Sequence, residues 1–324
     1  MVISSRPYQL VLGLFSLCAI AFTGCSNAQN SGSTDPVKVL FVAGKMSHAY
    51  NAHEHNAGSL LLAKALNDSD LGIEASVYFN KDNPGWTMDE ALLEGIDSVV
   101  IYCDGGGKHL ANDHVGAIDT LNNQGVGVGC LHYGVETIDG EPGDGFLRWM
   151  GGYFQLGKSV NPHWVAHFEK LPDHPVANGV KPFHIQDEWY FNMRFRDDME
   201  GVTPILTAIP PLDVIPAKDH HHNSTADARA AVKRGDPQHM MWVSENANGS
   251  RGFGFTGGHF HDNWQDDDFR KVVLNAIAWI SKVEVPKPGV SSATPTAEQL
   301  KQNQDYPEDL TKIRADKYAE SRRK

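Results

Sequence analysis

The chain has 324 residues, of which 41% are hydrophobic, and its 40 acidic residues outnumber its 28 basic ones, for a net charge of −12. This length suits one large domain or two ordinary ones, and the apolar content is enough to fill a core, which excludes intrinsic disorder for most of the chain. An acidic chain without a basic cluster repels phosphate backbones, so nucleic acid is not an expected partner. Sixteen histidines stand against only four cysteines, and this surplus is the compositional feature that a functional hypothesis has to explain.

The first 25 residues are typical of an export signal. Arg6 precedes an apolar run over residues 10–22, which is shorter than the ~20 residues that a membrane-spanning helix requires. The following Phe22-Thr-Gly-Cys25 resembles a bacterial lipobox, in which the cysteine is lipidated and becomes the mature N-terminus. We therefore expect an exported lipoprotein of the periplasm or outer membrane, anchored only through Cys25. The alternative is ordinary signal cleavage, with Cys25 incidental. Residues 26–36 are small and polar and are expected to form a flexible tether.

Strands and helices alternate in the next part of the chain. Strands are predicted at residues 37–43, 73–79, 97–103 and 125–131, and helices at 54–67, 88–93 and 113–123. The strands are continuous apolar runs, which is typical of strands buried on both faces of a parallel sheet. The pattern predicts an α/β fold with a doubly wound, mostly parallel sheet of the flavodoxin-like kind.

The section over residues 160–245 has a different character. Short strands are predicted at 163–168, 188–195, 202–209 and 239–243, separated by proline-rich loops. We expect an inserted antiparallel section here. A glycine-rich strand at 251–258 and an amphipathic helix at 266–282 then return to the sheet and complete one domain at 37–284. Residues 285–324 are expected to be a polar, peripheral C-terminal extension.

Several histidines follow predicted strand ends, where α/β sheets of this kind bind ligands. They are His48, His109, His132, His259 and His261. No pair has the compact spacing of a zinc motif such as His-Glu-x-x-His, and each histidine alone could equally be a hydrogen-bonded loop residue. His53 and His55, together with His48, could be ligands or could cap the first helix, and the run His220-His-His222 is expected to be solvated.

Two other features of this region have simpler interpretations. Gly105-Gly-Gly107 lacks the residue order of a phosphate-binding loop, so a tight turn is expected and a nucleotide cofactor is not. Cys103 and Cys130 end two predicted strands, where buried, inert thiols are more plausible than a disulfide.

The segment Cys130-Leu-His132-Tyr-Gly134 resembles the nucleophile elbow of class I glutamine amidotransferase-like folds, whose pattern is Gly-x-Cys-x-Gly. His132 stands at the nucleophile position, and His259 and His261 stand where those enzymes carry a catalytic His-Pro-Glu. Because Cys130 lies two residues too early and would point into the sheet, hydrolysis of glutamine through a thioester is not expected.

A closer resemblance is to the ThuA-like (trehalose utilisation) family, from the first strand to the last helix, about residues 37–282. The matching stretches, in order, are Val39-Leu-Phe-Val-Ala-Gly44 with His48, Val99-Val-Ile-Tyr102 with the glycine-rich turn, residues 130–134, residues 173–180, Gln186-Asp-Glu-Trp-Tyr190, and Gly258-His259 ahead of the helix at 275–279. The resemblance implies an amidotransferase-like fold and an association with sugar metabolism, often beside oxidised (keto) sugar pathways.

The expected catalytic residues are His132, Glu188 and His259, with His48 as a fourth ligand or proton shuttle. Two imidazoles, one carboxylate and an open position form the ligand set of a catalytic divalent ion, with zinc favoured. Without a metal, Glu188 could act as a base beside a ketone while the two histidines act as acid and oxyanion donor. For a small carbohydrate substrate, the expected binding residues are Asp104, Tyr133, Trp189 and His261, with Trp189 stacking on a sugar ring.

Three functional hypotheses follow. The first is an enzyme acting on a sugar or keto-sugar by hydrolysis or proton transfer. The second is a non-catalytic carbohydrate-binding or scaffold protein of the same fold. The third, a relative of amidotransferases or cysteine peptidases, would require Cys103 or Cys130 as a nucleophile.

Overall fold

A computed structural model describes residues 35–79, 90–220 and 222–308. The expected export signal with Cys25, nearly all of the tether, the start of the helix at 88–93 and the last 16 residues lie outside this range. From Pro36 onward the described chain forms one compact unit. None of its helices has the length and apolar character needed to cross a membrane.

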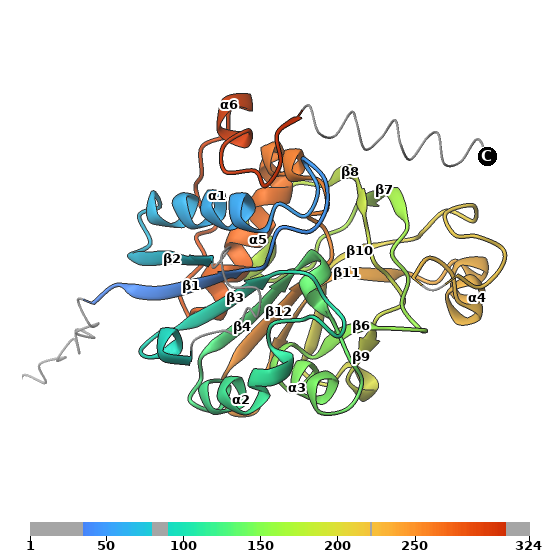
Figure 1. Ribbon diagram of the computed structural model, residues 1–324, viewed down its shortest axis with the longest axis horizontal. Coiled ribbons are helices and arrows are strands. Elements are labelled where there is room, and N and C mark those ends of the chain that lie inside the picture. The colour runs from blue at the N-terminus through green and yellow to red at the C-terminus, as the bar shows by residue number, and fades with distance from the viewer. Residues whose placement is uncertain (1–34, 80–89, 221, 309–324) are drawn as a thin grey trace, which may run out of the picture. The chain divides into compact units, whose positions relative to one another are not determined.

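A seven-stranded sheet forms the centre of the fold, in the order β10-β11-β12-β4-β3-β1-β2 (Figure 1). Five of its strands are parallel: β1 (Val37–Ala43), β2 (Ile73–Phe79), β3 (Ser98–Tyr102), β4 (Gly127–Leu131) and β12 (Arg251–Phe255). The predicted mostly parallel α/β sheet is thereby confirmed.

Two strands from the section predicted as an insertion belong to this sheet instead. β10 (Val202–Ala208) and β11 (Gln238–Glu245) extend its edge in antiparallel orientation next to β12. The physical reason is the connection between β11 and β12, which spans only residues 246–250. A link this short permits a hairpin, whereas a parallel neighbour requires a crossover of a dozen or more residues.

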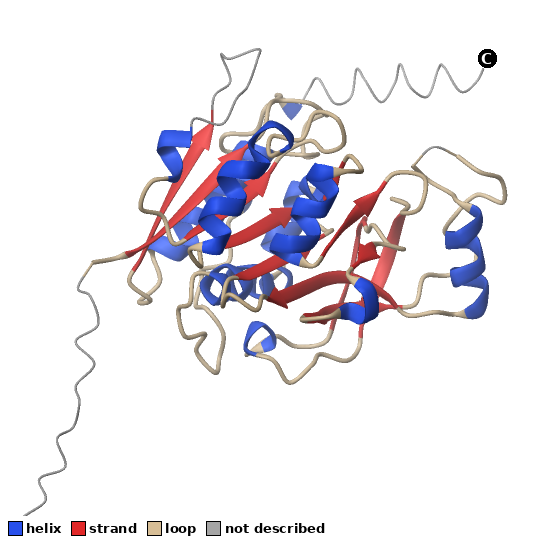
Figure 2. Cartoon of the chain, turned by 90° about the horizontal axis from the view of Figure 1, so that it is seen from below, coloured by secondary structure: helices blue, strands red, loops and turns tan. Residues whose placement is uncertain are grey.

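Helices cover both faces of the sheet, as Figure 2 shows. α1 (His55–Asn67) and α5 (Asp267–Ile280) pack against one face, and α2 (Val115–Asn123) and α3 (Glu141–Met150) against the other. In β1, Val39 and Phe41 enter the first core while Leu40 and Val42 enter the second. This division explains why the strands are continuously apolar.

Two helices were not predicted from the sequence. α3 contains Pro142, Gly143 and Gly145, residues with low helix propensity. α4 (Ala226–Arg234) does carry end signals, because the Thr225 side chain accepts a hydrogen bond from the Ala228 amide and Gly235 ends the helix in the left-handed conformation.

The remaining strands form two small sheets. β5 (Glu136–Thr137), β6 (Gly152–Gln155) and β9 (Arg194–Phe195) make one, and the antiparallel pair β7 (His163–Phe168) and β8 (Phe183–Glu188) makes the other. The strand predicted at 188–195 is therefore wrong. β8 ends at Glu188, which pairs with His163, and this places the Glu188 carboxylate at the end of a hairpin.

The segment after α5 was expected to be peripheral, but its first part packs into the domain. Val285, Val290 and Leu300 are buried in the same core as α5, and the Val290 amide donates to the Asn275 side chain (2.8 Å). The segment includes the short helix α6 (Ala297–Leu300). These apolar residues are spaced too widely to form a periodic pattern, which explains why the sequence did not reveal their burial.

Candidate active site

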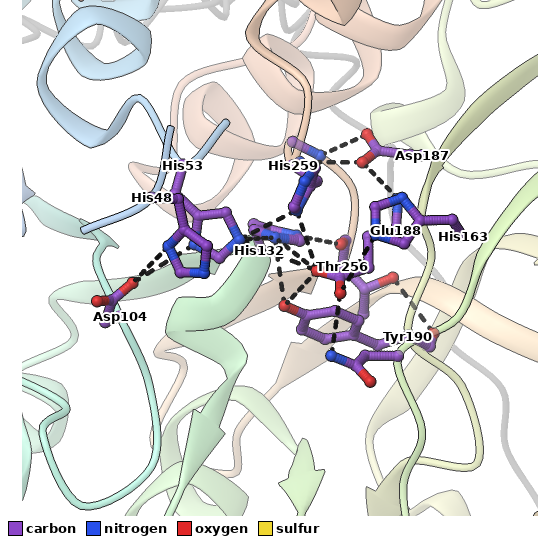
Figure 3. Close-up of polar contacts among 12 residues, drawn as sticks. His48, His53, Asp104, His132, His163, Asp187, Glu188, Tyr190, Thr256 and His259 are labelled. Carbon is purple, nitrogen blue, oxygen red and sulfur yellow. Dashed lines mark hydrogen bonds and ion pairs between the residues drawn. The ribbon is translucent and has the colours of Figure 1, made fainter. Parts of the chain in front are cut away.

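Four side chains from separate parts of the chain converge at the carboxyl end of the parallel strands (Figure 3). The His53 Nε2 atom lies 3.0 Å from His132 Nε2 and 3.1 Å from His259 Nδ1. The Glu188 Oε2 atom lies 3.1 Å from His259 Nδ1, 3.4 Å from His132 Nε2 and 3.9 Å from His53 Nε2. We call these four residues the His-Glu cluster.

The sheet brings His132 and His259 together. His132 directly follows β4 and His259 follows β12, and these strands are parallel neighbours in which Leu131 is paired with Phe255. His132 has a φ of +51°, the left-handed backbone of a sharp turn between the strand and a short 3-10 helix (His132–Val135). A left-handed conformation at a residue other than glycine is strained, and such strain concentrates at functional sites.

His53 joins the cluster from the loop before α1. This loop also has left-handed residues, since φ is +64° at Asn51 and +55° at His53. The C-terminal segment holds the loop: the Asn51 amide donates to Gln304 Oε1 (2.9 Å), and the Asp305 amide donates to Glu54 Oε2 (2.7 Å). The backbone that presents His53 is thus fixed by residues about 250 positions away.

One hydrogen bond determines the tautomer of His132. Its Nδ1 atom lies 2.9 Å from the carbonyl oxygen of Thr256. Because a carbonyl oxygen only accepts, Nδ1 carries the proton, and in the neutral ring Nε2 turns a lone pair toward the cluster. A histidine held in this way through its other ring nitrogen is typical of metal ligands.

The His53 ring is also almost completely buried. Its Nδ1 atom lies 3.4 Å from Asp104 Oδ1, and its side chain is 2% exposed. Burial, together with the neighbouring His132, lowers the pKa of His53 to about 3. The ring is therefore neutral at physiological pH.

Glu188 supplies the negative charge of the cluster. Burial alone would raise the pKa of Glu188, but hydrogen bonds with His132, His259 and His53 outweigh this effect and hold the pKa well below its usual range. The carboxylate is oriented from its other oxygen, Oε1, which accepts from Asn161 Nδ2 at 3.0 Å and lies 3.6 Å from His163 Nε2.

Two further buried residues support the cluster. Asp187 accepts hydrogen bonds from the amides of Gly258 (2.7 Å) and His259 (2.9 Å), which fixes the turn after β12. The Tyr190 hydroxyl lies 3.2 Å from His132 Nε2 and 3.3 Å from Glu188 Oε2. Sequence reasoning did not assign either residue a role. Their positions follow from the turn that ends β8, which has no clear signal in the sequence.

The spacing of the His-Glu cluster fits a metal ion. Ligands about 2.0–2.1 Å from a tetrahedral ion lie about 3.3–3.4 Å from one another, and the five separations given above range from 3.0 to 3.9 Å. The lone pair on His132 Nε2 faces His53 Nε2 at 3.0 Å, so either the N–H proton of His53 or a cation lies between the two atoms. Three imidazoles and a carboxylate suit zinc and other first-row divalent ions.

The expected residues His132, Glu188 and His259 thus lie together. His48 lies beside them, with its ring stacked on that of His53 at 3.5 Å between centroids, but its side chain is 41% exposed and it is not among the four converging groups. His53 occupies the fourth position instead. The sequence marked His53 only as one of several loop histidines, because nothing local to the loop distinguishes it.

A cavity of about 670 Å³ lies beside the cluster, on the side of His48. Asp104 and Tyr133, both expected to bind substrate, line it, together with Gly105–Gly107, Glu136 and His222. His222 was expected to be solvated, but its Nε2 atom lies 3.3 Å from Glu136 Oε1, and this contact raises the pKa of His222.

The prediction of a substrate-binding role is wrong for Trp189 and for His261. Trp189 is fully buried, donates its indole N–H to the Ile185 carbonyl (3.1 Å) and packs among Phe168, Phe255 and Phe269, so it cannot stack on a sugar. Consecutive residues of an extended chain point in opposite directions, and Trp189 enters the core because Glu188 faces the cluster.

His261 is also fully buried and lines neither the cavity nor the cluster. Its amide donates to the Asn51 carbonyl (2.9 Å), and burial lowers the pKa of its ring to about 4. The short 3-10 helix that begins at His261 turns the ring into the interior beneath the C-terminal segment.

Neither of the two described thiols is placed to act as a nucleophile. Among the described residues, Cys103 and Cys130 are unpaired and completely buried, and burial raises the pKa of both. Neither stands at the turn that His132 occupies, which disfavours a thiolate nucleophile.

Comparison with known proteins agrees with this fold. The sequence matches the ThuA family, described as "Trehalose utilisation", over residues 38–280. A ThuA-like protein from Bacteroides uniformis has 16% identity and a TM-score of 0.52, covering 78% of this chain and 94% of that one. A ThuA-like protein from Parabacteroides merdae has 16% identity and a TM-score of 0.49, with coverages of 82% and 99%.

A more remote similarity is to the glutaminase domain of Trypanosoma brucei CTPS, with 11% identity, a TM-score of 0.41 and coverages of 79% and 100%. No curated protein matches the sequence. The family match spans most of the chain and includes every member of the His-Glu cluster, and on this basis the protein belongs to the ThuA family.

Proposed function

We propose that this ThuA-family protein is a metal-dependent enzyme that acts on a sugar or keto-sugar. The observation that carries the proposal is the convergence of three imidazole nitrogens and one carboxylate oxygen at ligand spacing beside a cavity. The family description, trehalose utilisation, supports carbohydrate as the substrate class.

His53, His132 and His259 would hold the ion, which we expect to be zinc. When bound, a divalent ion polarises a carbonyl or acidifies a water or hydroxyl. Glu188 would serve either as the fourth ligand or as the base that accepts a proton from the substrate, and the Asn161 contact (3.0 Å) keeps its carboxylate oriented.

His48 is suited to carry protons between the cluster and solvent. It stacks on His53, its Nδ1 atom lies 2.8 Å from Ser47 Oγ, and it lines the cavity. Burial lowers the pKa of His48 below that of a free imidazole, so the neutral ring can take up a proton and release it to solvent.

The cavity has the size and chemistry of a carbohydrate site. Its volume of about 670 Å³ lies within the usual range of small-molecule pockets, ~300–1,000 Å³. The carboxylates of Asp104 and Glu136 can accept hydrogen bonds from sugar hydroxyls, and Tyr133 offers an aromatic face. The absence of a glycine-rich phosphate loop in the sequence argues against a nucleotide cofactor.

Export is a separate part of the proposal and rests on the sequence of residues 1–25. We propose a lipoprotein of the periplasm or outer membrane with lipid on Cys25. An inhibitor of signal peptidase II should leave an uncut precursor, and normal processing in its presence would contradict the lipid anchor.

The enzymatic proposal is tested with protein that has been stripped of metal and reloaded with zinc, manganese or iron. Each form is incubated with a panel of disaccharides and their 3-keto derivatives, and products are followed by mass spectrometry. We expect turnover only in a reloaded form, lost in His132→Ala and Glu188→Gln and retained in the surface variant His167→Ala. Protein that binds no ion near one equivalent refutes the metal centre, while sugar binding without turnover would support the carbohydrate-binding alternative.

A further inference from the structure

A second group of possible ligands surrounds Asp104, which follows β3 and faces His53 from the side opposite His132 (Figure 3). Its Oδ1 atom lies 3.4 Å from His53 Nδ1, 3.7 Å from His55 Nε2 and 3.8 Å from His48 Nδ1. The Asp104 side chain is 26% exposed and lines the cavity.

These three separations are too long for ordinary hydrogen bonds, which measure about 2.7–3.2 Å. They are close to the separations of about 3.3–3.4 Å between ligands of one tetrahedral ion. In contrast, Ser47 Oγ makes a normal hydrogen bond of 2.9 Å to the same carboxylate oxygen. The Asp104 carboxylate can therefore form short contacts at this position, yet the three imidazole nitrogens lie farther from it than hydrogen-bond distance.

Two of the facing nitrogens are buried and lack a hydrogen-bond partner within the described part of the chain, His53 Nδ1 and His55 Nε2. In His55, Nδ1 lies 3.0 Å from the Lys45 carbonyl and must donate to it, so in the neutral ring Nε2 presents a lone pair to the Asp104 carboxylate. Two acceptors that face each other repel, and a cation bound to the Asp104 carboxylate reduces this repulsion.

We propose that His48, His53 and Asp104 form a second divalent-cation site, with His55 behind the carboxylate. It rests on the proposed function because His53 belongs to both groups, with Nε2 directed to the first site and Nδ1 to the second. When both ions bind, the neutral His53 ring loses its one N–H proton to solvent and bridges the ions as an imidazolate. Borderline ions that accept nitrogen and oxygen ligands, such as zinc, copper(II) and cobalt(II), suit both sites.

The second site would be the more accessible one to substrate. His48 and Asp104 both line the cavity, whereas His53 and His132 are buried. Two neighbouring ions can bind two oxygens of one substrate, as in other two-metal enzymes. The second ion thus extends the proposed metal chemistry into the cavity and suits a substrate with adjacent hydroxyl or carbonyl oxygens.

The test is the metal stoichiometry of the full-length mature protein titrated with zinc and measured by elemental analysis. We expect two ions per chain in the wild type, one in Asp104→Asn, and two in the control Asp227→Asn on α4. His48→Ala, at a more exposed position, should weaken the second binding step at least tenfold without affecting the first. If Asp104→Asn does not fold, the second binding step of His48→Ala serves as the test instead.

Electron paramagnetic resonance of the copper(II) protein gives an independent readout, because an imidazolate bridge couples the spins of two copper ions. With two equivalents of copper, the integrated signal of the wild type should be smaller than the signal expected from its copper content. Asp104→Asn should show the full signal of one ion. A wild type that binds one ion refutes the second site and leaves the proposed function standing. A wild type that binds none refutes both, and two uncoupled ions unaffected by Asp104→Asn overturn the assignment to these residues.

Discussion

His132 donates its Nδ1 proton to the carbonyl oxygen of Thr256 across 2.9 Å. The two residues follow β4 and β12, which are paired in parallel, so the sheet itself determines which nitrogen of His132 faces Glu188. The orientation of the His132 ring is thus fixed by backbone at the ends of two paired strands.

Removal of the His132 imidazole should remove the stabilisation that zinc provides at the His-Glu cluster. Binding at a hundred times the dissociation constant stabilises a protein by about 2.7 kcal/mol, which corresponds to a rise in Tm of roughly 5–10 °C for a domain of this size. We expect at least this shift in the wild type and in His167→Ala, and a clearly smaller one in His132→Ala, measured by calorimetry. An equal shift in all three proteins would place the zinc elsewhere.

Trp189 should matter for stability rather than for sugar binding. Trp189→Ala would leave a cavity among Phe168, Phe255 and Phe269 and should cost about 3–5 kcal/mol of unfolding free energy. Trp189→Phe keeps most of the packing and should retain sugar affinity. A Trp189→Phe protein of wild-type stability that no longer binds sugar would contradict its assignment to the core.

The contact between His222 and Glu136 should depend on pH. Its hydrogen bond with Glu136 raises the pKa of His222 above the value of 6.5 for an unperturbed ring. A raised histidine pKa contributes stability that is fully present below about pH 6.5 and is lost as the pH rises through the folded-state pKa. Below this window, the amide of Asn161, which donates to the His222 carbonyl (2.9 Å), should be better protected from hydrogen exchange.

Glu136→Gln serves as the matched control for this prediction, because it keeps the shape of the side chain and removes its charge. Comparison at each pH cancels the intrinsic pH dependence of exchange. If the wild type and Glu136→Gln show the same protection from pH 5.5 to 8.5, the ion pair does not hold this part of the cavity wall.

The C-terminal segment should support metal binding through Gln304 and Asp305. Truncation after residue 303 removes their hydrogen bonds to Asn51 and Glu54, and the loss of one bond to a charged group is worth about 1.5–3 kcal/mol. We expect zinc affinity to fall roughly tenfold or more in a competition titration. Truncation after residue 308 keeps both contacts and should bind zinc like the full chain. Equal affinities would show that the loop carrying His53 is held by other contacts.

Cys103 and Cys130 should be unreactive in the native protein. Both thiols are buried and have a raised pKa, so a chain that begins at Ser26 should react with a thiol reagent only after denaturation. Alkylation should leave turnover unchanged. Rapid inactivation by the reagent would instead support a cysteine nucleophile.

The central sheet could be predicted from the sequence because its strands are apolar on both faces. β1 and β2 have the predicted bounds, Val37–Ala43 and Ile73–Phe79. The edge strands β10 and β11 were placed in a separate section because strand pairing is not visible in a single strand's composition. Their membership of the sheet is determined by the hairpin between β11 and β12.

Some residues of the candidate site could likewise be predicted from the sequence, and others could not. His132 and His259 follow strand ends, but His109 and His261 do too, so this position narrowed the set of candidate histidines without identifying the pair. The place of His53 could not be found, because the left-handed backbone at Asn51 and His53 is held by contacts from Gln304 and Asp305. The prediction that Trp189 stacks on a sugar conflicted with the prediction that Glu188 faces the site. In an extended chain, consecutive side chains point in opposite directions.

The left-handed turn at His132 has a consequence for how new activities arise on this fold. Its backbone is fixed by the pairing of β4 with β3 and β12 and by the close approach of Gly134 to the Ile101 carbonyl, and none of these contacts involves the imidazole. A mutation at position 132 therefore exchanges the reactive group without rebuilding the turn. The turn thus acts as a fixed mount at the sheet edge, and the side chain at position 132 can be varied in experiments with the backbone contacts of the turn intact.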